Sequence, residues 1–275
     1  MKENFYPLTY TREISELRCG AKTLAEHPER KPEYIWDLIV SLKDDLEKDI
    51  KTIGSSVKGN VHPSAVIYSP ENVVIEEGVE IEACAVLDAR SGPIYIGKNT
   101  LIRPQSYLKG PLYIGPECRI GGEVTHSIFH GYSNKAHYGF IGHSYIGEWV
   151  NLGAGTTCSN LKNNYGTVKI ARDLGSGIRD LKEVDSRQQF IGCFIGDYAK
   201  LGIGTLINTG SLIGVGANIW GGGVTPKFVP NFAWGMEGKT DLEKMINNIK
   251  IVMKRRNIIL SQQKEKSIRD LYPVI

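Results

Sequence analysis

Aliphatic residues recur at every sixth position along much of this chain. Two long runs keep this spacing, Ile96, Ile102, Leu108, Ile114 and Ile120, and Ile195, Leu201, Ile207, Ile213 and Ile219. Shorter runs are Ile75, Ile81 and Leu87, and Phe140, Ile146 and Leu152. A period of six fits neither an α-helix nor a simple alternating strand. It is typical of a triangular solenoid, in which each unit forms one side, three units form a coil, and the aliphatic residues stack along the axis.

Glycine often follows the aliphatic residue, as in Ile96-Gly97, Ile146-Gly147 and Ile195-Gly196. The chain has 31 glycines, and the corners of such a solenoid need tight or left-handed backbone conformations that glycine adopts readily. We therefore predict an all-β fold, a left-handed parallel β-helix of hexapeptide repeats. This handedness is an exception to the usual right-handed crossover.

The repeat is interrupted twice. Between Ile120 and Phe140 the spacing leaves the six-residue lattice, and residues 161–190 are polar and irregular. We interpret the second interruption as a loop that leaves the coil and returns to it. Long loops inside compact domains tend to be functional.

Both ends of the chain differ from the repeat and have apolar residues at helical spacing. The sequence predicts a helical segment at 1–55, a solenoid at 56–236 that includes the loop 161–190, and a helical segment at 237–275. The apolar positions are Ile35, Leu38, Ile39, Leu42 and Leu46 in the first segment and Leu242, Met245, Ile246, Ile249 and Met253 in the last. Thr240, with Glu243 three residues on, resembles a capping box at the start of the last helix.

Composition excludes several classes of protein. The 33 basic and 30 acidic residues leave a net charge of +3, too balanced to indicate a nucleic-acid or membrane surface. No apolar run approaches the roughly 20 residues that span a bilayer. The five cysteines are scattered and form no CxxC pair, which indicates reduced thiols in a cytoplasmic protein rather than a zinc site.

Polar residues gather in the stretch "SNKAHYGFIGHSYIGEWVNLGAGTTCSN" at 133–160. A solenoid axis takes aliphatic residues, so the histidines should project outward or lie at a corner. Lys135, Asn151 and Asn160 surround His137 at spacings that place them on neighbouring coils or adjacent faces. A neutral imidazole can accept a proton, and asparagine amides can fix a polar substrate. From spacing alone, an active site and a surface histidine are equally open for His137, whereas a structural role is favoured for His143.

This stretch resembles the acetyltransferase half of the bifunctional glucosamine-1-phosphate acetyltransferase / N-acetylglucosamine-1-phosphate uridyltransferase family. It is still more similar to the variant found in archaea and some bacteria. The close match covers about residues 120–170, from "GGEVTHSIFHGYSNKAHYGF" onward, and continues more loosely from about 60 to 235. The motif includes a five-residue slip between Ile141-Gly142 and Ile146-Gly147.

The resemblance implies roles at the matching positions. The catalytic base of the family falls on His137, and substrate-contacting residues fall on Asn151, Asn160 and near Glu123, with Lys162 as a looser match. The backbone positions that receive acetyl-CoA fall near Ala154, Ile203 and Gly221, and Trp220 either packs on the cofactor or covers the coil.

Three departures from the family pattern concern the sugar site. A tyrosine of that site is Phe140 here, a phosphate-binding lysine is Thr125, and Arg103 matches a phosphate-binding arginine only after a gap. Charge-assisted hydrogen bonds are the strong ones, so losing a phosphate-binding cation matters. We expect that the acceptor can differ from glucosamine 1-phosphate.

The N-terminal stretch "FYPLTYTREISELRCGAKTL" resembles the opening of the same family, in which a nucleotidyltransferase domain follows. Here about 50 residues precede the solenoid, and the G-x-G-T-x-R signature that cradles phosphates is absent. The sequence therefore predicts a remnant of that domain at 1–55 and no nucleotidyltransferase activity.

The first hypothesis is an acetyl-CoA-dependent N-acetyltransferase of an amino sugar, phosphorylated or nucleotide-linked. His137 is the base, Lys135 and Phe140 line the sugar site, acetyl-CoA is the co-substrate, and acyl transfer requires no metal. The resemblance also implies a homotrimer with active sites between subunits. Two alternatives stay open: a non-catalytic module that binds a sugar nucleotide or a partner, and a metal-dependent lyase that needs three converging histidines.

Overall fold

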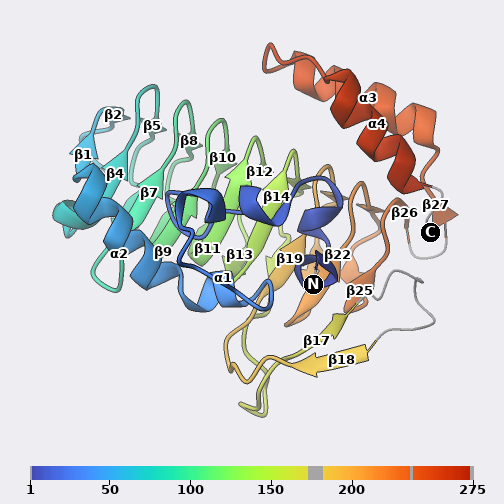
Figure 1. The fold of residues 1–275 in the computed structure, drawn as a ribbon. Helices are drawn as coiled ribbons and strands as arrows, with labels where there is room; N and C mark the ends of the chain where they lie inside the picture. Colours follow the sequence, from blue (N-terminus) through green and yellow to red (C-terminus); the bar gives the residue numbers. More distant parts are fainter. Residues whose placement is uncertain (1, 173–181, 236–237, 273–275) are drawn as a thin grey trace.

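The chain folds into a left-handed parallel β-helix with helical segments packed on its outside (Figure 1). The computed structural model describes residues 2–172, 182–235 and 238–272. Each coil contributes one short strand to each of three faces, and strands from successive coils pair in parallel, with one break on the third face between β13 and β16. The fold class predicted from the six-residue period is confirmed.

The three faces are made of short strands in coil order. The first face contains β1 (Ser56–Val57), β4 (Val73–Ile75), β7 (Ile94–Ile96), the end of β9 (Tyr107–Ile114), the end of β11 (Glu123–Gly131), β14 (Tyr145–Glu148), β19 (Cys193–Ile195), β22 (Ser211–Ile213) and β25 (Phe228–Val229). The second face contains β2 (Asn60–Val61), β5 (Glu80–Ile81), β8 (Leu101–Ile102), β10 (Arg119–Ile120), β12 (Asn134–Lys135), β15 (Asn151–Leu152), β20 (Lys200–Leu201), β23 (Asn218–Ile219) and β26 (Ala233–Trp234), with β27 (Gly238–Lys239) antiparallel at its end. The third face contains β3 (Val66–Tyr68), β6 (Val86–Asp88), the starts of β9 and β11, β13 (Phe140–Gly142), β16 (Thr157–Cys158), β21 (Thr205–Ile207) and β24 (Gly223–Val224).

The repeated aliphatic residues point into the solenoid and stack in register. On the first face Ile75 pairs with Ile96, and Ile96 pairs with Ile114. All three are fully buried. Burial of this axial column supplies the hydrophobic stabilisation that holds the coils together.

The first interruption of the repeat is a shortened coil. After Ile120, the next axial residue of the chain is Val124 and the one after it is Phe129. From Phe129 the six-residue spacing resumes through Lys135 to Ile141. The spacing had placed Phe140 on the axis, and this was wrong: Ile141 is fully buried there, whereas Phe140 is partly exposed on the third face.

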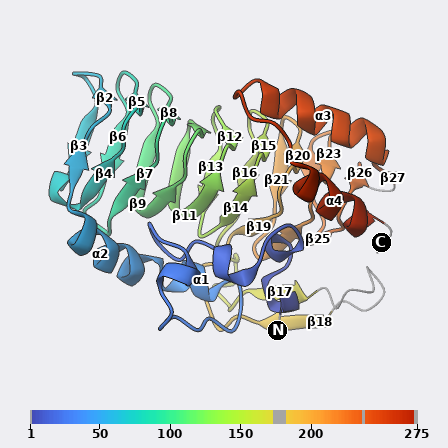
Figure 2. The same cartoon turned by 45° about the horizontal axis from the view of Figure 1, so that its top comes forward.

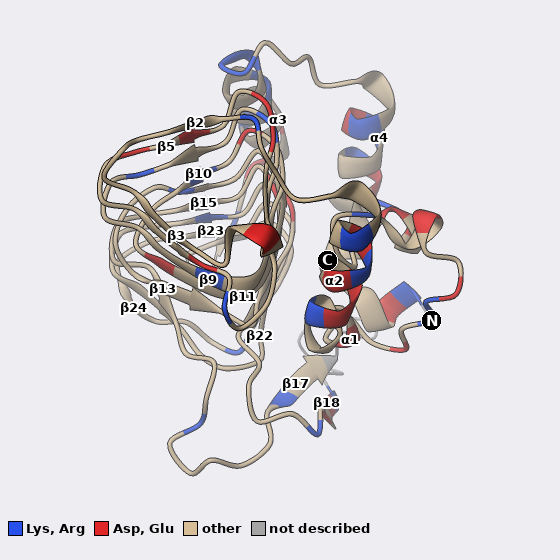
Figure 3. Cartoon of the chain, turned by 90° about the vertical axis from the view of Figure 1, so that its left-hand side faces the viewer, with Lys and Arg blue, Asp and Glu red and all other residues tan. Residues whose placement is uncertain are grey.

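The N-terminal segment covers the first face. It contains short 3₁₀ turns at Lys2–Phe5, Leu8–Tyr10, Ile14–Glu16 and Leu24–Glu26, followed by α1 (Asp37–Val40) and α2 (Leu42–Ile53). Its buried residues, among them Phe5, Leu38 and Leu42, pack against outward-pointing residues of the face such as Tyr145 and Phe194. Viewed along the solenoid, α1 and α2 lie outside one wall of the ring (Figure 3). The predicted helical spacing in this segment is confirmed.

The C-terminal segment forms two helices, α3 (Leu242–Lys254) and α4 (Gln262–Leu271), rather than one. Met245 and Met253 of α3 pack with Trp149 and Phe232 at the corner between the first and second faces. Figure 2 shows α3 lying over the later strands of the second face. The N-cap is Asp241, whose side chain accepts a hydrogen bond from the Lys244 backbone; the prediction of Thr240 was wrong by one residue. No helix among the described residues is long and apolar enough to cross a bilayer.

The second interruption is an insertion that begins and ends at the same place. Leu161 and Phe190 form an isolated antiparallel bridge at its base. Contrary to the prediction of a plain loop, the insertion carries two antiparallel strands, β17 (Lys169–Arg172) and β18 (Lys182–Asp185). Residues 173–181, which the prediction included, lie outside the described residues. Ile146 pairs directly with Ile195 across the insertion, so the solenoid continues in register.

One buried ionic network joins all three parts of the chain. Arg12, from the N-terminal segment, lies 2.7 Å from Asp197 and 3.3 Å from Glu148 of the solenoid. Thr11 donates a hydrogen bond to Asp197 at 2.6 Å. Lys264 of α4 lies 3.7 Å from the same carboxylate. Breaking a buried pair by removing one partner is strongly destabilising, so this network fixes how the end segments sit on the solenoid.

Candidate functional site

Half of the predicted site residues lie along one edge of the solenoid, the corner between the second and third faces. We call this edge the corner row and define it by Arg103, His137, Ala154, Ile203 and Trp220, which occupy turns of different coils, together with Gly221 in the turn of Trp220. Backbone hydrogen bonds join neighbouring turns: Gly155 donates to the Tyr138 carbonyl at 3.0 Å, and Gly204 donates to the Ala154 carbonyl at 2.8 Å. Parallel strands repeat at about 4.8 Å, so neighbouring members of the row lie within reach of one ligand.

His137 is exposed at its turn between β12 and β13. Among the described residues, its imidazole has neither a hydrogen-bond partner nor an ion pair. Both ring nitrogens are therefore available to a ligand. An exposed histidine without a protein partner is in a position to accept a proton from a bound nucleophile.

Lys135 points the other way, into the solenoid. It pairs in register with Ile120 and is 2% exposed. Its ammonium donates hydrogen bonds to the carbonyls of Gly121 at 2.7 Å and His137 at 2.6 Å. Desolvation lowers its pKa to about 8, against an opposing effect of Glu123. Its position does not fit the predicted contact with a substrate on the surface; instead it joins the turn that carries His137 to the turn of the shortened coil.

Three turns of the corner row offer free backbone donors. The amides of Ala154, Ile203 and Gly221 donate to no acceptor among the described residues. Gly221 has a φ of +97°, a left-handed conformation that favours glycine. Free amides at the edge of a sheet can bind carbonyl groups of a ligand or a developing oxyanion.

The remaining predicted residues flank the corner row on either side. Asn151 is exposed on the second face, where it pairs with Asn134 and Lys200. Glu123 is exposed at the start of β11 on the third face, where it pairs with Phe140. Glu123 and Asn151 thus lie on the two faces that meet at the corner, so polar groups are present on both sides of the row.

Asn160 lies at a different corner, between the third and first faces. Its amide nitrogen is 2.8 Å from Nδ1 of His143. The His143 ring stacks on His126 at 4.4 Å and on Phe190 at 5.3 Å between centroids. Burial, with a smaller effect of His126, lowers the pKa of His143 to about 3. The structural role favoured for His143 agrees with this packing, whereas Asn160 is engaged with His143 rather than placed beside His137.

Three further predicted residues have partners of their own. Lys162 donates to the carbonyl of Thr167 within the insertion at 2.6 Å. Arg103 lies 3.0 Å from Glu82. Trp220 is 55% exposed and packs edge-on against Trp234, with 6.3 Å between ring centroids.

Sequence reasoning missed Tyr138, which is 73% exposed beside His137 and packs close to Gly155 on the next turn. An aromatic residue adjacent to the candidate base was a usable signal, since exposed aromatic side chains are common in binding sites. It also missed Lys200 and Trp234, because their importance comes from the C-terminal helix that packs above them.

Among the residues that the structure describes, no three histidines gather as a metal-dependent lyase would need. His126 donates through Nε2 to the Ile39 carbonyl at 2.8 Å, and His130 lies 3.4 Å from Glu148. Within the described ranges, no group of three or more His, Cys, Asp or Glu side chains is placed to hold a metal ion.

Comparisons with known proteins place the chain beside sugar-phosphate enzymes. It is 34% identical over 197 residues to a bifunctional sugar-1-phosphate nucleotidylyltransferase/acetyltransferase of Sulfurisphaera tokodaii, covering 70% of this chain and 45% of that protein. It is 37% identical over 92 residues to the bifunctional protein GlmU of Picosynechococcus, covering 33% and 19%. The chain thus spans less than half the length of these relatives. No protein-family model matches it. The resemblance inferred from the motif is confirmed.

Solved structures with similar coils are distant in sequence. A putative acetyltransferase of Bacillus cereus is 16% identical, with a TM-score of 0.33, and covers 78% of this chain and 92% of that one. The polySia-specific acetyltransferase NeuO is 14% identical, with a TM-score of 0.37, and covers 74% and 97%. At these scores the likeness carries no argument about the site.

Proposed function

We propose that the protein is an acetyl-CoA-dependent N-acetyltransferase whose acceptor is an amino sugar. The observation that carries this proposal is the corner row, where an exposed, unpartnered imidazole at His137 lies one coil from the free amide of Ala154. A base and an oxyanion donor on neighbouring coils, whose strands repeat at about 4.8 Å, are the two groups that acyl transfer needs. The similarity to an acetyltransferase-bearing relative supports the same reaction.

In this mechanism the amine nitrogen of the sugar attacks the thioester carbonyl while His137 accepts the proton. The Ala154 amide donates to the oxygen that becomes negative. The C–S bond then breaks, the amide product forms, and the thiolate of coenzyme A takes up the proton from His137. The amides of Ile203 and Gly221 continue the row away from His137 and offer donors to carbonyl groups of the pantetheine arm.

The flanking faces define the acceptor. Glu123 and Asn151 present a carboxylate and an amide on opposite sides of His137, and both are suited to sugar hydroxyls. Phe140 offers no hydroxyl, and Thr125 no charge. Arg103 is the cationic residue of the corner row. It lies on an earlier coil than His137 and is half-exposed beside Glu82. We infer an acceptor that is phosphorylated or nucleotide-linked and need not be glucosamine 1-phosphate.

The test is release of the coenzyme A thiol from acetyl-CoA with a panel of amino sugars that includes glucosamine 1-phosphate. Turnover should fall by about 10²–10⁴ in the His137→Ala variant, the range for loss of a general base. Thermal stability should stay unchanged, because the side chain is exposed and unpartnered.

His62→Ala provides a matched control, since His62 is exposed at the same corner on the first coil and its ring bonds Ser64 alone within the described residues. Its turnover should equal that of the unchanged protein. If the His137→Ala variant turned over as fast as the wild-type protein, the assignment of His137 as the base would be wrong. Acetyl-CoA binding without turnover on any acceptor would favour the alternative of a non-catalytic binding module.

Two further parts of the proposal are measured separately. A homotrimer of this 30.5 kDa chain should show about three times that mass in light scattering, since closed rings of identical subunits are common. A pyrophosphate-release assay with UTP and sugar phosphates should show no turnover, because the phosphate-cradling signature is absent.

A further inference from the structure

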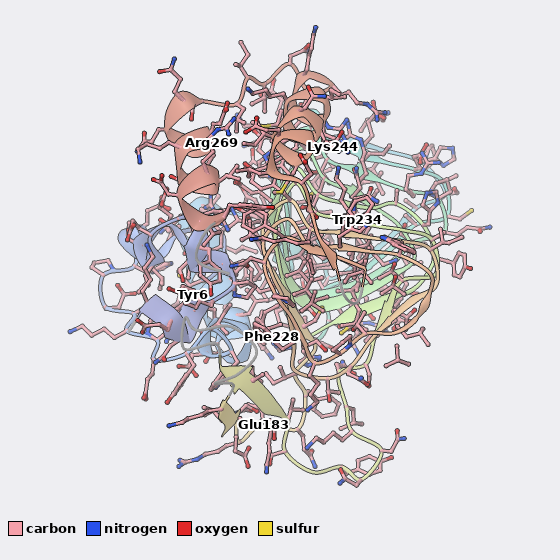
Figure 4. The ribbon with its side chains drawn as sticks, turned by 90° about the vertical axis from the view of Figure 1, so that its right-hand side faces the viewer. Tyr6, Glu183, Phe228, Trp234, Lys244 and Arg269 are labelled. Carbon is pink, nitrogen blue, oxygen red and sulfur yellow. The ribbon has the colours of Figure 1, made fainter. Side chains whose placement is uncertain are left out.

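A cavity of about 380 Å³ lies between helix α3 and the second face of the solenoid. Its floor is formed by Lys200, Asn218 and Trp234 of β20, β23 and β26, and its roof includes Lys244 and Asn248 of α3. Viewed from the C-terminal end of the solenoid, Lys244 and Trp234 lie one above the other on the same side of the molecule (Figure 4). Small-molecule sites occupy about 300–1,000 Å³, so the cavity is large enough for a compact ligand.

The lining carries an excess of positive charge. Lys200, Lys239 and Lys244 line the cavity, and Asp241 is the single carboxylate among its described lining residues. That carboxylate already accepts the backbone N–H of Lys244 at 2.9 Å, as the N-cap of α3. The helix therefore begins at the cavity and adds the partial positive charge of its N-terminus.

Two of the three ammonium groups are uncompensated. Within the described part of the chain, Lys200 and Lys244 have no hydrogen-bond partner or carboxylate within 4 Å of their side-chain nitrogens. Lys239 is partly engaged, donating to the Tyr272 carbonyl at 3.3 Å and lying over the Tyr272 ring at 3.9 Å. Desolvation lowers the pKa of the half-buried Lys200, and a bound anion would offset that cost.

Aromatic and amide groups complete the lining. The indole of Trp234 is 46% exposed and is held edge-on by Trp220 of the corner row. A flat, exposed indole is suited to stacking on a planar base, and the amides of Asn218 and Asn248 are suited to ribose hydroxyls.

The cavity is also connected to the candidate site. On the second face Asn134, Asn151, Lys200 and Asn218 pair in register on successive strands. At about 4.8 Å per strand, Lys200 lies one strand from Asn151 and Trp234 lies three strands from it. A row of polar side chains therefore runs along the second face from Asn151, which flanks the corner row, into the cavity.

We propose that this cavity is a binding site for a nucleoside diphosphate, with the diphosphate on Lys200 and Lys244 and the base on Trp234. A nucleoside diphosphate group occurs in two possible ligands, as the ADP end of coenzyme A and as the nucleotide of a nucleotide-linked sugar. The proposal goes beyond acetyl transfer and does not rest on it, because binding is measured without turnover.

The test is titration calorimetry of the full chain with ADP and UDP. We expect saturable binding of at least one of them, weakened by rising salt. The Lys200→Met, Lys244→Met double variant should bind about 100-fold more weakly, since each charge-assisted hydrogen bond contributes about tenfold. Inorganic phosphate and adenosine, which each carry only part of the ligand, should bind more weakly than the diphosphate.

Lys254→Met is the matched control, because Lys254 is exposed on the same helix and lies outside the cavity lining. Its affinity should be unchanged. Lys244→Met alone keeps the test usable if the double variant misfolds, since Lys244 is exposed. The absence of binding to either diphosphate at millimolar concentration would overturn the proposal. So would a Lys244→Met variant that binds as tightly as the unchanged protein.

A competition experiment then distinguishes the two sources. If coenzyme A raises the apparent Kd for ADP, the cavity receives the ADP end of the cofactor. If the Kd for the nucleotide is unchanged at saturating coenzyme A, the cavity receives a second nucleotide. Failure of acetyl transfer on every acceptor would leave both binding results interpretable.

Discussion

Two histidines on the same coil have opposite environments. His137 lies at the corner between the second and third faces, exposed and without a side-chain partner among the described residues. His143, six residues later, lies at the next corner, where it bonds Asn160 and stacks between His126 and Phe190. Repetition of the solenoid makes the two corners locally similar. The difference shows that the segments packed over a corner, rather than the corner itself, decide whether its side chains are accessible to a ligand.

That cover comes from distant parts of the sequence. His126, on which His143 stacks, donates to the Ile39 carbonyl of the N-terminal segment, and Phe190 belongs to the base of the insertion. In the described structure His137, Ile203 and Trp220 of the corner row are exposed, and the turn at His137 is held from the inside by Lys135. The first corner is therefore suited to chemistry and the second to structure.

The largest expected effect separates the two histidines by turnover. His143→Phe preserves a planar ring between His126 and Phe190 and removes no group from the corner row. It should keep turnover within about tenfold of the unchanged protein, whereas His137→Ala should lose about 10²–10⁴. Steady-state rates at saturating acetyl-CoA measure both. Equal losses in the two variants would break the distinction between an open and a covered corner.

The second prediction tests whether Lys135 stabilises the turn that carries His137. Lys135→Met keeps the aliphatic length in the axial position but leaves the carbonyls of Gly121 and His137 without their donor. Buried unsatisfied groups cost about 1–3 kcal/mol each, so the loss of the donor to two carbonyls should lower the free energy of unfolding by about 2–6 kcal/mol. Urea denaturation measures it. Lys98→Met, at an exposed position, is the control, and an equal small change in both variants would contradict the role of Lys135.

A third effect depends on pH. An unfolded histidine binds a proton near pH 6.5, whereas folded His143 has its pKa lowered to about 3 by burial and by His126. Stability from this residue is thus complete above pH 6.5 and falls as the pH drops toward 3. Linkage gives a loss of about 2 kcal/mol between pH 6.5 and 5. Denaturation curves of the unchanged protein and of His143→Phe should differ by that slope. Parallel pH dependences would show that His143 titrates freely.

The smallest effect concerns the ion pair at the open corner. Arg103 and Glu82 are partly exposed, with side chains 44% and 35% accessible. Exposed pairs contribute about 0–1 kcal/mol, so Arg103→Ala should change the free energy of unfolding by less than about 1 kcal/mol. The same variant should raise the KM for a phosphorylated acceptor and leave that for an uncharged amino sugar unchanged. A large loss of stability would mean that this pair, and not Lys135, holds the corner.

The fold was predictable because each side of the solenoid repeats an aliphatic residue at every sixth position of the sequence. The stacks through Ile96, Ile114 and Ile195 follow directly from the six-residue spacing. The axial position of Lys135 was also accessible, since Phe129, Lys135 and Ile141 keep that spacing. It was missed because a lysine is not expected on an apolar axis, and only the two carbonyls left free by the shortened coil explain it.

The site was predictable only in part. The corner row of His137, Ala154 and Ile203 is local to the repeat, so motif spacing places these residues at equivalent turns. The partner of Asn160 was not predictable, because its engagement with His143 depends on the cover supplied by residues near Ile39 and Phe190. The cavity under α3 could not be predicted from the sequence either, because nothing in the repeat indicates which face a terminal helix will cover.

The direct pairing of Ile146 with Ile195 has a consequence for the order in which the chain folds. Most strands of the solenoid pair with a strand about one coil away, so nucleation at any coil spreads along a short contour. Between the coil of β14–β16 and the coil of β19–β21, the chain must close over the whole insertion before the strands can pair. Loop-closure entropy rises by only about 0.6 kcal/mol per doubling of length, so the native state loses little stability. We therefore expect the stack to fold as two blocks, β1–β16 and β19–β26, which join where β14, β15 and β16 pair with β19, β20 and β21.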